Sequence, residues 1–299
     1  MDERPFVADS AGITLQGTVR SPDSPRGVAV LVSGSGPIDR NSDHRRLPLG
    51  VMRLVAEALT DGGWASVRYD KRGVGASTGD YWTAGLYDNI ADARAVAQRA
   101  RHEVGGPLVL VGHSEGAVIA AELSGEADTC DGAVLLAGMA GTGEATLRWQ
   151  AQALESQVPA PARAVMRLLR TSVAAQQDKQ LARLAASTRD SSRIQLVSRI
   201  NAKWFREFMT YDAGAALARA AVPLLAVTGD KDVQVPPSDL ETMEAIVGDG
   251  ITTRLVPDVD HILRHEPRQV SSPRAYRTQA RSPLDARVVQ AVTQWLDRW

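Results

Sequence analysis

The sequence predicts an α/β protein with a mostly parallel central sheet, helices on its faces and a helical segment inserted late in the chain. The first observation behind this prediction is a series of short, continuously apolar runs, which are typical of strands buried on both faces. The second is that stretches with helical spacing separate most of these runs, and this alternation favours a parallel sheet wrapped by helices. The third is size, because 299 residues, of which 44% are hydrophobic, can bury a large core.

The expected elements follow in order along the chain. Two extended pieces over 6–19 flank the turn sequence Asp9-Ser10-Ala11-Gly12 and predict a hairpin. The expected buried strands lie at 27–34, 64–70, 107–112, 132–138, 223–230 and 251–257. The expected helices lie at 47–59, at 88–101, directly after Ser114, and at 284–299. In such sheets the chemistry gathers at the carboxyl ends of the strands, so the residues just after each strand are the candidates for a site.

One segment, residues 141–212, interrupts the alternation. It contains no predicted strand, is rich in Ala, Leu, Arg and Gln, and has helical patterning at 146–155, 162–184 and 201–209. Because the sheet pattern resumes directly after it, we interpret it as a helical cap inserted into one core rather than as a separate domain. The core is then expected to comprise 1–140 and 213–299.

Composition argues against several classes of function. With 34 basic and 35 acidic residues, the formal net charge of −1 gives no indication of a nucleic-acid or anionic-membrane partner. Cys130 is the only cysteine, so the chain has no internal disulfide and no Cys-x-x-Cys metal motif. No apolar run approaches the roughly 18 residues of a membrane-spanning helix, and acidic residues stand where a signal peptide would be positive. We expect a soluble cytoplasmic protein, and nothing in the sequence indicates its oligomeric state.

The segment GHSEG (112–116) joins the third buried strand to the helix that follows. Gly-x-Ser-x-Gly in this position is the nucleophile elbow of the α/β-hydrolases, in which a strained turn projects the serine hydroxyl above the sheet. Gly112 and Gly116 would remove side chains that collide with the adjacent strand and helix. A glycine-flanked turn that happens to hold a serine is the alternative, but the strand–turn–helix context favours Ser114 as a nucleophile.

A nucleophilic serine needs a base, and in this fold the histidine comes last in the chain order Ser, Asp or Glu, His. Two of the five histidines lie beyond Ser114 without adjoining it. His261 lies in the segment VPDVDHILR, just beyond the sixth strand, where a catalytic loop belongs. His265 stands in a charged stretch one helical turn further on and is interpreted as a solvated loop residue. His261 is therefore the predicted base.

The predicted acid follows the fifth strand, in the segment TGDKDVQVP (228–236). Gly229-x-x-Asp232, followed by the apolar Val233, is expected to place the Asp232 carboxylate in the loop that faces the histidine. Asp230, next to Lys231, is the alternative.

Two backbone N–H groups are the predicted oxyanion-hole donors. One belongs to Glu115, at the positive end of the helix after the elbow. The other belongs to Ser35, in the small-residue loop SGSGPIDRN (33–41) after the first buried strand, where the backbone can approach a ligand closely. Gly36 is a candidate substrate contact in the same loop, and with Pro37 it also fits a simple turn. A phosphate-binding loop is the rival interpretation, but Gly-Lys-Ser/Thr is missing.

Several of these motifs, taken in their order along the chain, resemble one family. This family is the esterase-like α/β-hydrolases with a helical cap, the branch grouped with serine aminopeptidase-like and bile-acid-CoA acyltransferase-like hydrolases. The matching segments span most of the chain: SGSGPIDRN, RYDKRGVGAST (68–78), VGHSEGA (111–117), KWFREFMTYD (203–212), VPLLAVTGDKDVQVP (222–236) and DVDHILR (258–264).

The resemblance implies a Ser114–Asp232–His261 triad served by the Ser35 and Glu115 donors. It also implies that Trp204, Phe205 and Arg206, on the cap, face the acyl pocket. Asp70 and Arg72 would lie beneath the oxyanion loop, where we interpret them as a structural ion pair at a turn.

Together these features predict a serine hydrolase that cleaves a small-molecule carboxylic ester or thioester through an acyl-enzyme, with no metal or organic cofactor. Acyl transfer or small-peptide hydrolysis would use the same triad, so these remain alternatives within the fold. A ligand-binding receptor without turnover is the alternative from another class. Residues 141–207 contain eleven Lys and Arg against five Asp and Glu. This excess suits an anionic ester or acyl-CoA, but arginines on solvated helix faces are the favoured explanation.

Overall fold

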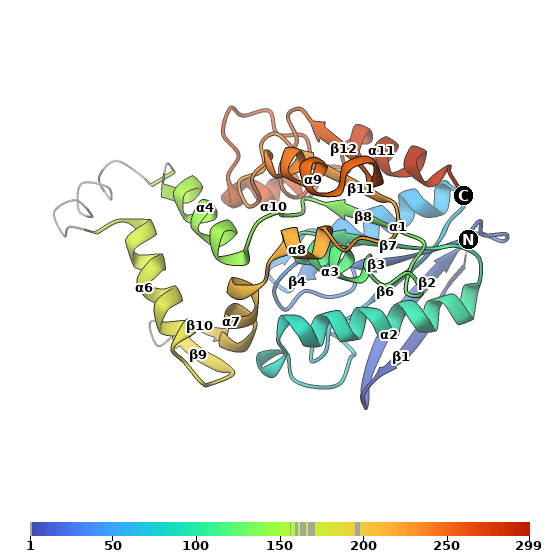
Figure 1. Cartoon of the computed structure of the whole chain (residues 1–299), viewed down its shortest axis with the longest axis horizontal. Coiled ribbons are helices and arrows are strands. Elements are labelled where there is room, and N and C mark those ends of the chain that lie inside the picture. The colour runs from blue at the N-terminus through green and yellow to red at the C-terminus, as the bar shows by residue number, and fades with distance from the viewer. Residues whose placement is uncertain (1, 156, 159–160, 162–165, 167–170, 195–197) are drawn as a thin grey trace.

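The computed structural model describes residues 2–155, 157–158, 161, 166, 171–194 and 198–299. Within these residues, an eight-stranded sheet runs through the molecule in the order β1-β2-β6-β3-β7-β8-β11-β12 (Figure 1). β1 pairs antiparallel with β2, and β2 with β6, whereas the later neighbours pair in parallel. The strands are β1 (Asp2–Ser10), β2 (Ile13–Ser21), β3 (Val28–Val32), β6 (Ala65–Tyr69), β7 (Leu108–His113), β8 (Gly132–Leu136), β11 (Leu224–Gly229) and β12 (Ile251–Val256).

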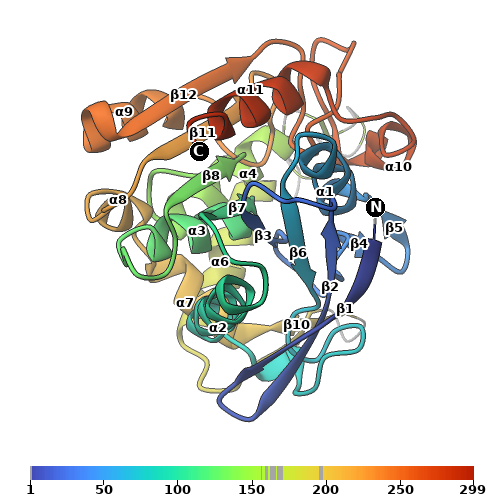
Figure 2. The same cartoon turned by 90° about the vertical axis from the view of Figure 1, so that its right-hand side faces the viewer.

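Helices cover both faces of this sheet (Figure 2). One buried apolar cluster joins the sheet to α2 (Leu86–Val104), α3 (Glu115–Leu123), α8 (Ala213–Leu217) and α9 (Asp239–Val247). A second cluster joins the opposite face to α1 (Val51–Asp61) and α11 (Ala286–Leu296). The predicted fold class, a mostly parallel sheet between two helical layers, is confirmed. Short elements lie in the loops between these strands and helices: β4 (Asp43–His44), β5 (Leu47–Pro48), η1 (Tyr81–Thr83), η2 (Gly248–Gly250), η3 (Pro273–Ala275) and α10 (Tyr276–Gln279).

The stretch between β8 and α8 projects to one side of the sheet (Figure 1). Thr142 and Asp212, at its two ends, pair in an isolated antiparallel bridge. Its elements are α4 (Gly143–Glu155), α6 (Val173–Ala185), β9 (Ser191–Ile194), β10 (Ser198–Asn201) and α7 (Ala202–Thr210). The helix expected at 162–184 corresponds in its second half to α6, while 162–165 and 167–170 lie outside the described residues.

Three details differ from expectation. The β9–β10 hairpin lies where no strand was predicted, because its polar residues give no apolar run and it pairs only with itself. The helix expected from residue 47 begins at Val51, since Leu47–Pro48 pairs with Asp43–His44. The sixth apolar strand, β12, is the edge of the sheet and is partly exposed rather than buried on both faces.

No helix in the described part of the chain is both long and apolar enough to span a bilayer. The carboxyl ends of β3, β7, β11 and β12 lie at one edge of the parallel region, and the loops that follow them carry the predicted site residues.

Candidate active site

Ser114 stands at the junction of β7 and α3 in a backbone conformation that L-residues rarely adopt, with φ 57° and ψ −116°. The flanking glycines permit this turn. A Cβ on Gly112 would overlap the Gly116 carbonyl, and a Cβ on Gly116 would overlap the carbonyl of Val32 in β3. The turn therefore packs backbone directly against backbone, and the strain at Ser114 is of the kind that functional sites store.

Asp232 and His261 come together from the loops after β11 and β12. The Asp232 carboxylate lies 2.7 Å from Nδ1 of His261, and each residue is only 3% exposed. The other carboxylate oxygen accepts the backbone N–H groups of Gln234, at 2.7 Å, and Val235, at 2.9 Å. Because the carboxylate is held from both sides, it fixes the orientation of the imidazole ring.

The alternative acid and base lie at the surface. Asp230 is exposed and accepts the backbone N–H of Asp258 at 2.7 Å, which holds the turn between β11 and the histidine loop. His265 is exposed as well. Neither residue contacts the Asp232–His261 pair through a hydrogen bond.

His113, the residue before Ser114, contacts the predicted base. Its Nε2 lies 2.8 Å from the backbone carbonyl of His261, and the two ring centroids are 5.0 Å apart. Burial, together with the neighbouring His261, lowers the pKa of His113 to about 3. The ring is therefore neutral near pH 7, and Nε2–H is the tautomer that can donate to the carbonyl.

The two predicted oxyanion donors have backbone N–H groups that can still donate to a ligand. Among the described residues, neither Ser35 nor Glu115 donates its backbone N–H to another protein group. Glu115 is the first residue of α3, where the helix dipole favours an anion. Gly36 follows Ser35 with φ +97°, but it does not line the neighbouring cavity.

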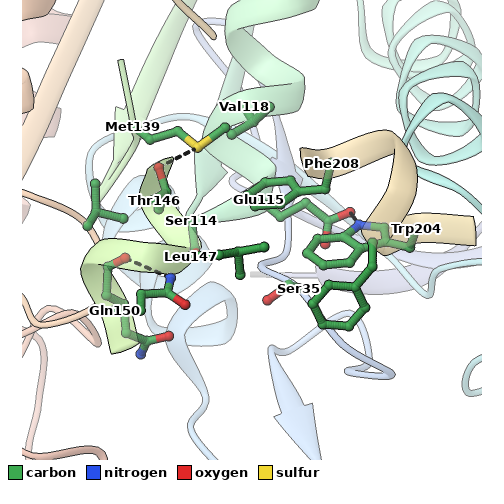
Figure 3. Close-up of a pocket in the computed structure, with 13 residues that line it drawn as sticks. Ser35, Ser114, Glu115, Val118, Met139, Thr146, Leu147, Gln150, Trp204 and Phe208 are labelled. Carbon is green, nitrogen blue, oxygen red and sulfur yellow. Dashed lines mark hydrogen bonds between the residues drawn. The ribbon is translucent and has the colours of Figure 1, made fainter. Parts of the chain in front are cut away.

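A cavity of about 170 Å³ opens over Ser114. Figure 3 shows side chains of α4 and α7, such as Leu147 and Trp204, reaching into it from the two sides. Its lining contains no lysine or arginine among the described residues. The lining residues are Ser35, Ser114, Glu115, Val118, Met139, Thr146, Leu147, Gln150, Trp204, Phe205, Phe208, Gln234 and Val235.

Of the three cap residues that the resemblance places at the acyl pocket, two line the cavity and the third does not. Trp204 and Phe205 line the cavity, and the Trp204 ring stacks on Phe208 at a centroid distance of 4.6 Å. Arg206 does not line it. Its guanidinium donates to the Arg189 carbonyl at 2.8 Å, on the side of α7 that faces away. Successive helical residues point about 100° apart, so Arg206 cannot share the face of Trp204.

The Glu115 side chain is buried beneath the cavity and is only 3% exposed. Its carboxylate accepts a hydrogen bond from the Asn89 amide at 2.7 Å. It also accepts one from the Trp204 indole N–H at 3.1 Å (Figure 3). The Lys71 ammonium, 4% exposed, lies 2.9 Å from the same carboxylate and 2.6 Å from the Gly34 carbonyl. Sequence reasoning missed this cluster, because it assigned Glu115 a role only through its backbone and Lys71 none.

The expected ion pair between Asp70 and Arg72 is wrong. Asp70 instead binds Arg40 in the loop after β3, with a carboxylate–guanidinium distance of 2.7 Å. Burial alone would raise the pKa of Asp70, but hydrogen bonds from Arg40 and Ala76 outweigh it, and the pKa lies below its ordinary value. Arg72 turns the other way and pairs with Asp92 of α2 at 2.5 Å. Neighbouring residues in this turn thus point to opposite sides, which separates the two charges.

Comparison with known proteins agrees with the fold. Residues 49–268 match the family model described as serine aminopeptidase, S33. Esterase EstD of Thermotoga maritima is 25% identical over 302 aligned residues, which cover 98% of this chain and 68% of that protein.

Solved structures share the fold at low identity. Est1E of Butyrivibrio proteoclasticus with bound ferulic acid gives a TM-score of 0.64 at 16% identity and is matched over 98% of both chains. Pyrococcus furiosus esterase PF2001 gives 0.64 at 15% identity, covering 100% of this chain and 91% of that one. Proline iminopeptidase of Mycobacterium smegmatis gives 0.65 at 14% identity, covering 99% and 98%.

The fold and the family match define an esterase-like serine hydrolase of the α/β-hydrolase class. Within that class, the chain belongs to the serine aminopeptidase S33 family, whose model matches most of its length. The resemblance inferred from the sequence motifs is confirmed.

Proposed function

We propose that this protein hydrolyses small-molecule carboxylic esters through a covalent acyl-enzyme on Ser114. The observation that carries the proposal is the buried Asp232–His261 hydrogen bond of 2.7 Å at the same edge of the sheet as the strained serine. His261 takes the Ser114 proton as the hydroxyl oxygen attacks the ester carbonyl, and then gives that proton to the leaving alcohol. Asp232 holds the imidazole tautomer and stabilises the imidazolium. Water activated by His261 then releases the acid.

The tetrahedral intermediates carry a negative oxygen, which the backbone N–H groups of Ser35 and Glu115 would receive. The freedom of both groups from protein partners, and the position of Glu115 at the start of α3, support this assignment. No metal or organic cofactor takes part in the proposed steps.

The cavity supports an uncharged acyl group. Its volume of about 170 Å³ and its aromatic and aliphatic lining suit a short chain or a single ring. The Glu115 carboxylate, which faces the cavity, is matched by Lys71 rather than left for a cationic substrate. The described lining residues include no cation to pair with the anionic substrate that the charge of the cap suits, and Arg206 faces away.

We also propose that residues 141–212 act as one cap over a core formed by 1–140 and 213–299. The Thr142–Asp212 bridge at the base of the segment, and the contribution of α4 and α7 to the cavity lining, support this division. The cap would then set the size of the acyl group.

Labelling with a fluorophosphonate probe tests the proposal, since the probe reacts only with an activated serine. Wild-type protein is expected to label and to hydrolyse p-nitrophenyl esters of short acids, while Ser114→Ala and His261→Ala do neither. His265→Ala is the matched control, because this exposed histidine makes no hydrogen bond to the pair. A folded wild-type protein that neither labels nor turns over would contradict the proposal.

A further inference from the structure

We propose that Lys71 is a positioning residue that holds the Gly34–Ser35 peptide with its N–H directed at the oxyanion of the reaction. This inference rests on the proposed function, because it assigns a task to Lys71 within the same oxyanion hole. Lys71 does not line the cavity. It acts through the backbone it binds.

The geometry of the peptide carries the first step. The Lys71 ammonium donates to the Gly34 carbonyl at 2.6 Å, a short, charge-assisted hydrogen bond. No peptide bond in the described chain is cis, and in a trans peptide the C=O and the following N–H point in opposite directions. Holding the Gly34 oxygen on the lysine side therefore turns the Ser35 N–H to the other side. Ser35 lines the cavity beside Ser114.

The second step is that this peptide needs a holder. Rotation of this peptide changes ψ of Gly34 and φ of Ser35, and Gly34 carries no side chain that restricts the first of these angles. Within the described part of the chain, the Ser35 N–H has no protein acceptor to fix it. If the peptide turned over, the Gly34 carbonyl would face the developing oxyanion and repel it. A donor that is already fixed stabilises the transition state without any rearrangement of the loop. A donor on a freely rotating peptide would first have to be oriented.

The third step explains why a lysine is tolerated at this buried position. Its ammonium lies 2.9 Å from the Glu115 carboxylate, and both side chains are almost fully buried. A buried charge is tolerated when it is paired and its other hydrogen bonds are made. Asn89 and Trp204 donate to the remaining carboxylate oxygen. The lysine is thus fixed between two acceptors.

The same pair connects the two proposed donors. Glu115 contributes its own backbone N–H at the start of α3, and its side chain holds the lysine that orients the peptide of Ser35. The spacing between the two donors is therefore set by one buried contact. Because Trp204 belongs to α7, the position of this cap helix is tied to the same carboxylate.

The test compares Lys71→Met with Arg72→Met. The first variant keeps the length of the side chain but removes the donor to Gly34. We expect kcat on p-nitrophenyl butyrate to fall about 10- to 100-fold with KM changed less than about threefold, since loss of a whole oxyanion donor costs ~10²–10³. Arg72→Met is the matched control. It also breaks an ion pair to a buried carboxylate, that of Asp92, but its guanidinium makes no hydrogen bond to the oxyanion loop, so kcat is expected to stay within about threefold.

A second readout separates positioning from a general structural effect. A trifluoromethyl ketone adds the serine oxygen to form a tetrahedral oxyanion, whereas the matching unreactive ether occupies the cavity without one. Lys71→Met is expected to weaken inhibition by the trifluoromethyl ketone by about the same factor as kcat/KM, and to leave ether binding almost unchanged. Equal losses for both inhibitors, or kcat within about threefold of wild type, would overturn the inference.

Two further variants keep the test decisive. Glu115→Gln retains Lys71 as the donor to Gly34, so it is expected to lose less kcat than Lys71→Met; an equal or larger loss contradicts the inference. If Lys71→Met alone does not fold, Lys71→Met/Glu115→Met leaves no unpaired buried charge and is expected to show the same selective loss of trifluoromethyl ketone affinity. Failure of the proposed function gives a different result, because wild-type protein itself would then neither label nor turn over.

Discussion

The ring of His113 donates a hydrogen bond from Nε2 to the backbone carbonyl of His261 at 2.8 Å, so the residue before the predicted nucleophile supports the loop of the predicted base. This contact joins the end of β7 to the loop after β12, two segments 148 residues apart. Burial keeps this ring neutral near pH 7 and lowers its pKa, so protonating it in the folded protein is unfavourable.

His113 is expected to make folding weaker at low pH. Burial lowers its pKa in the folded protein to about 3, below the ordinary value of 6.5. Between these values the unfolded chain binds more protons, so the free energy of unfolding falls as the pH drops, by up to about 1.4 kcal/mol per pH unit. Urea unfolding of His113→Gln, whose amide can still donate to the carbonyl, is expected to show a flatter slope between pH 6.5 and 4. An unchanged slope would show that other groups dominate acid unfolding.

Asp232→Asn is expected to lower kcat by about 10⁴-fold while the protein stays folded. The amide can occupy the place of the carboxylate, but it neither holds the required tautomer of His261 nor stabilises the imidazolium. Initial rates on p-nitrophenyl acetate and a thermal melt check both parts. Asp230→Asn is the control two residues away, and because Asp230 is exposed we expect its kcat within about threefold of wild type. Comparable losses of kcat in the two variants would favour Asp230, the alternative acid, over Asp232.

Ser114→Gly is expected to be more stable than Ser114→Ala, by about 1 kcal/mol. Both lack the hydroxyl and should be inactive, but only glycine adopts φ 57° with ψ −116° without a steric cost. Chemical denaturation of the two inactive proteins compares them without any contribution from activity. Equal stability would mean that the elbow stores no strain at this residue.

Leu147→Ala is expected to shift the preference towards longer acyl chains. Leu147 projects from α4 into the cavity, so truncation makes room for more of the substrate. Each additional methylene that becomes buried is worth about 0.8 kcal/mol, or roughly fourfold in kcat/KM. Leu154→Ala is the matched control, because Leu154 lies on the same helix but is 41% exposed and outside the cavity. Kinetics on p-nitrophenyl esters from acetate to octanoate measure the shift, and identical chain-length profiles would contradict the assignment of this pocket.

Much of the fold was predictable because its signals are local. Five of the six apolar runs became buried strands, since a run such as 28–32 has no polar face to present to water. The sixth became the partly exposed edge strand β12. An apolar run predicts a strand, but it does not predict the position of that strand in the sheet. The β9–β10 hairpin was missed for the opposite reason: its residues are polar, and their pairing depends only on each other.

The features of the site also divide into those that a local sequence pattern predicts and those that it does not. The elbow could be predicted, because the requirement for Gly112 and Gly116 follows from backbone contacts within a few residues and one neighbouring strand. Arg206 could not be placed correctly from its neighbours in sequence, because one helical position decides whether a side chain faces the cavity. Asp70 and Arg72 stand two positions apart but pair with Arg40 and Asp92, and no local pattern assigns a role to the lysine between them.

The sequence by itself determined the order in which most strands and helices follow one another along the chain. It also determined the strained serine turn and the residue types able to serve as nucleophile, base and acid. These depend on hydrophobic period, on glycine at defined offsets and on chain order, which are properties of short segments. Only the tertiary structure decided which charges meet. Lys71 lies 44 residues before Glu115, and whether an ammonium is solvated or buried against a carboxylate and the Gly34 carbonyl depends on which loops the sheet brings to one edge. That long-range choice is set by the packing of the whole core, which no local pattern encodes.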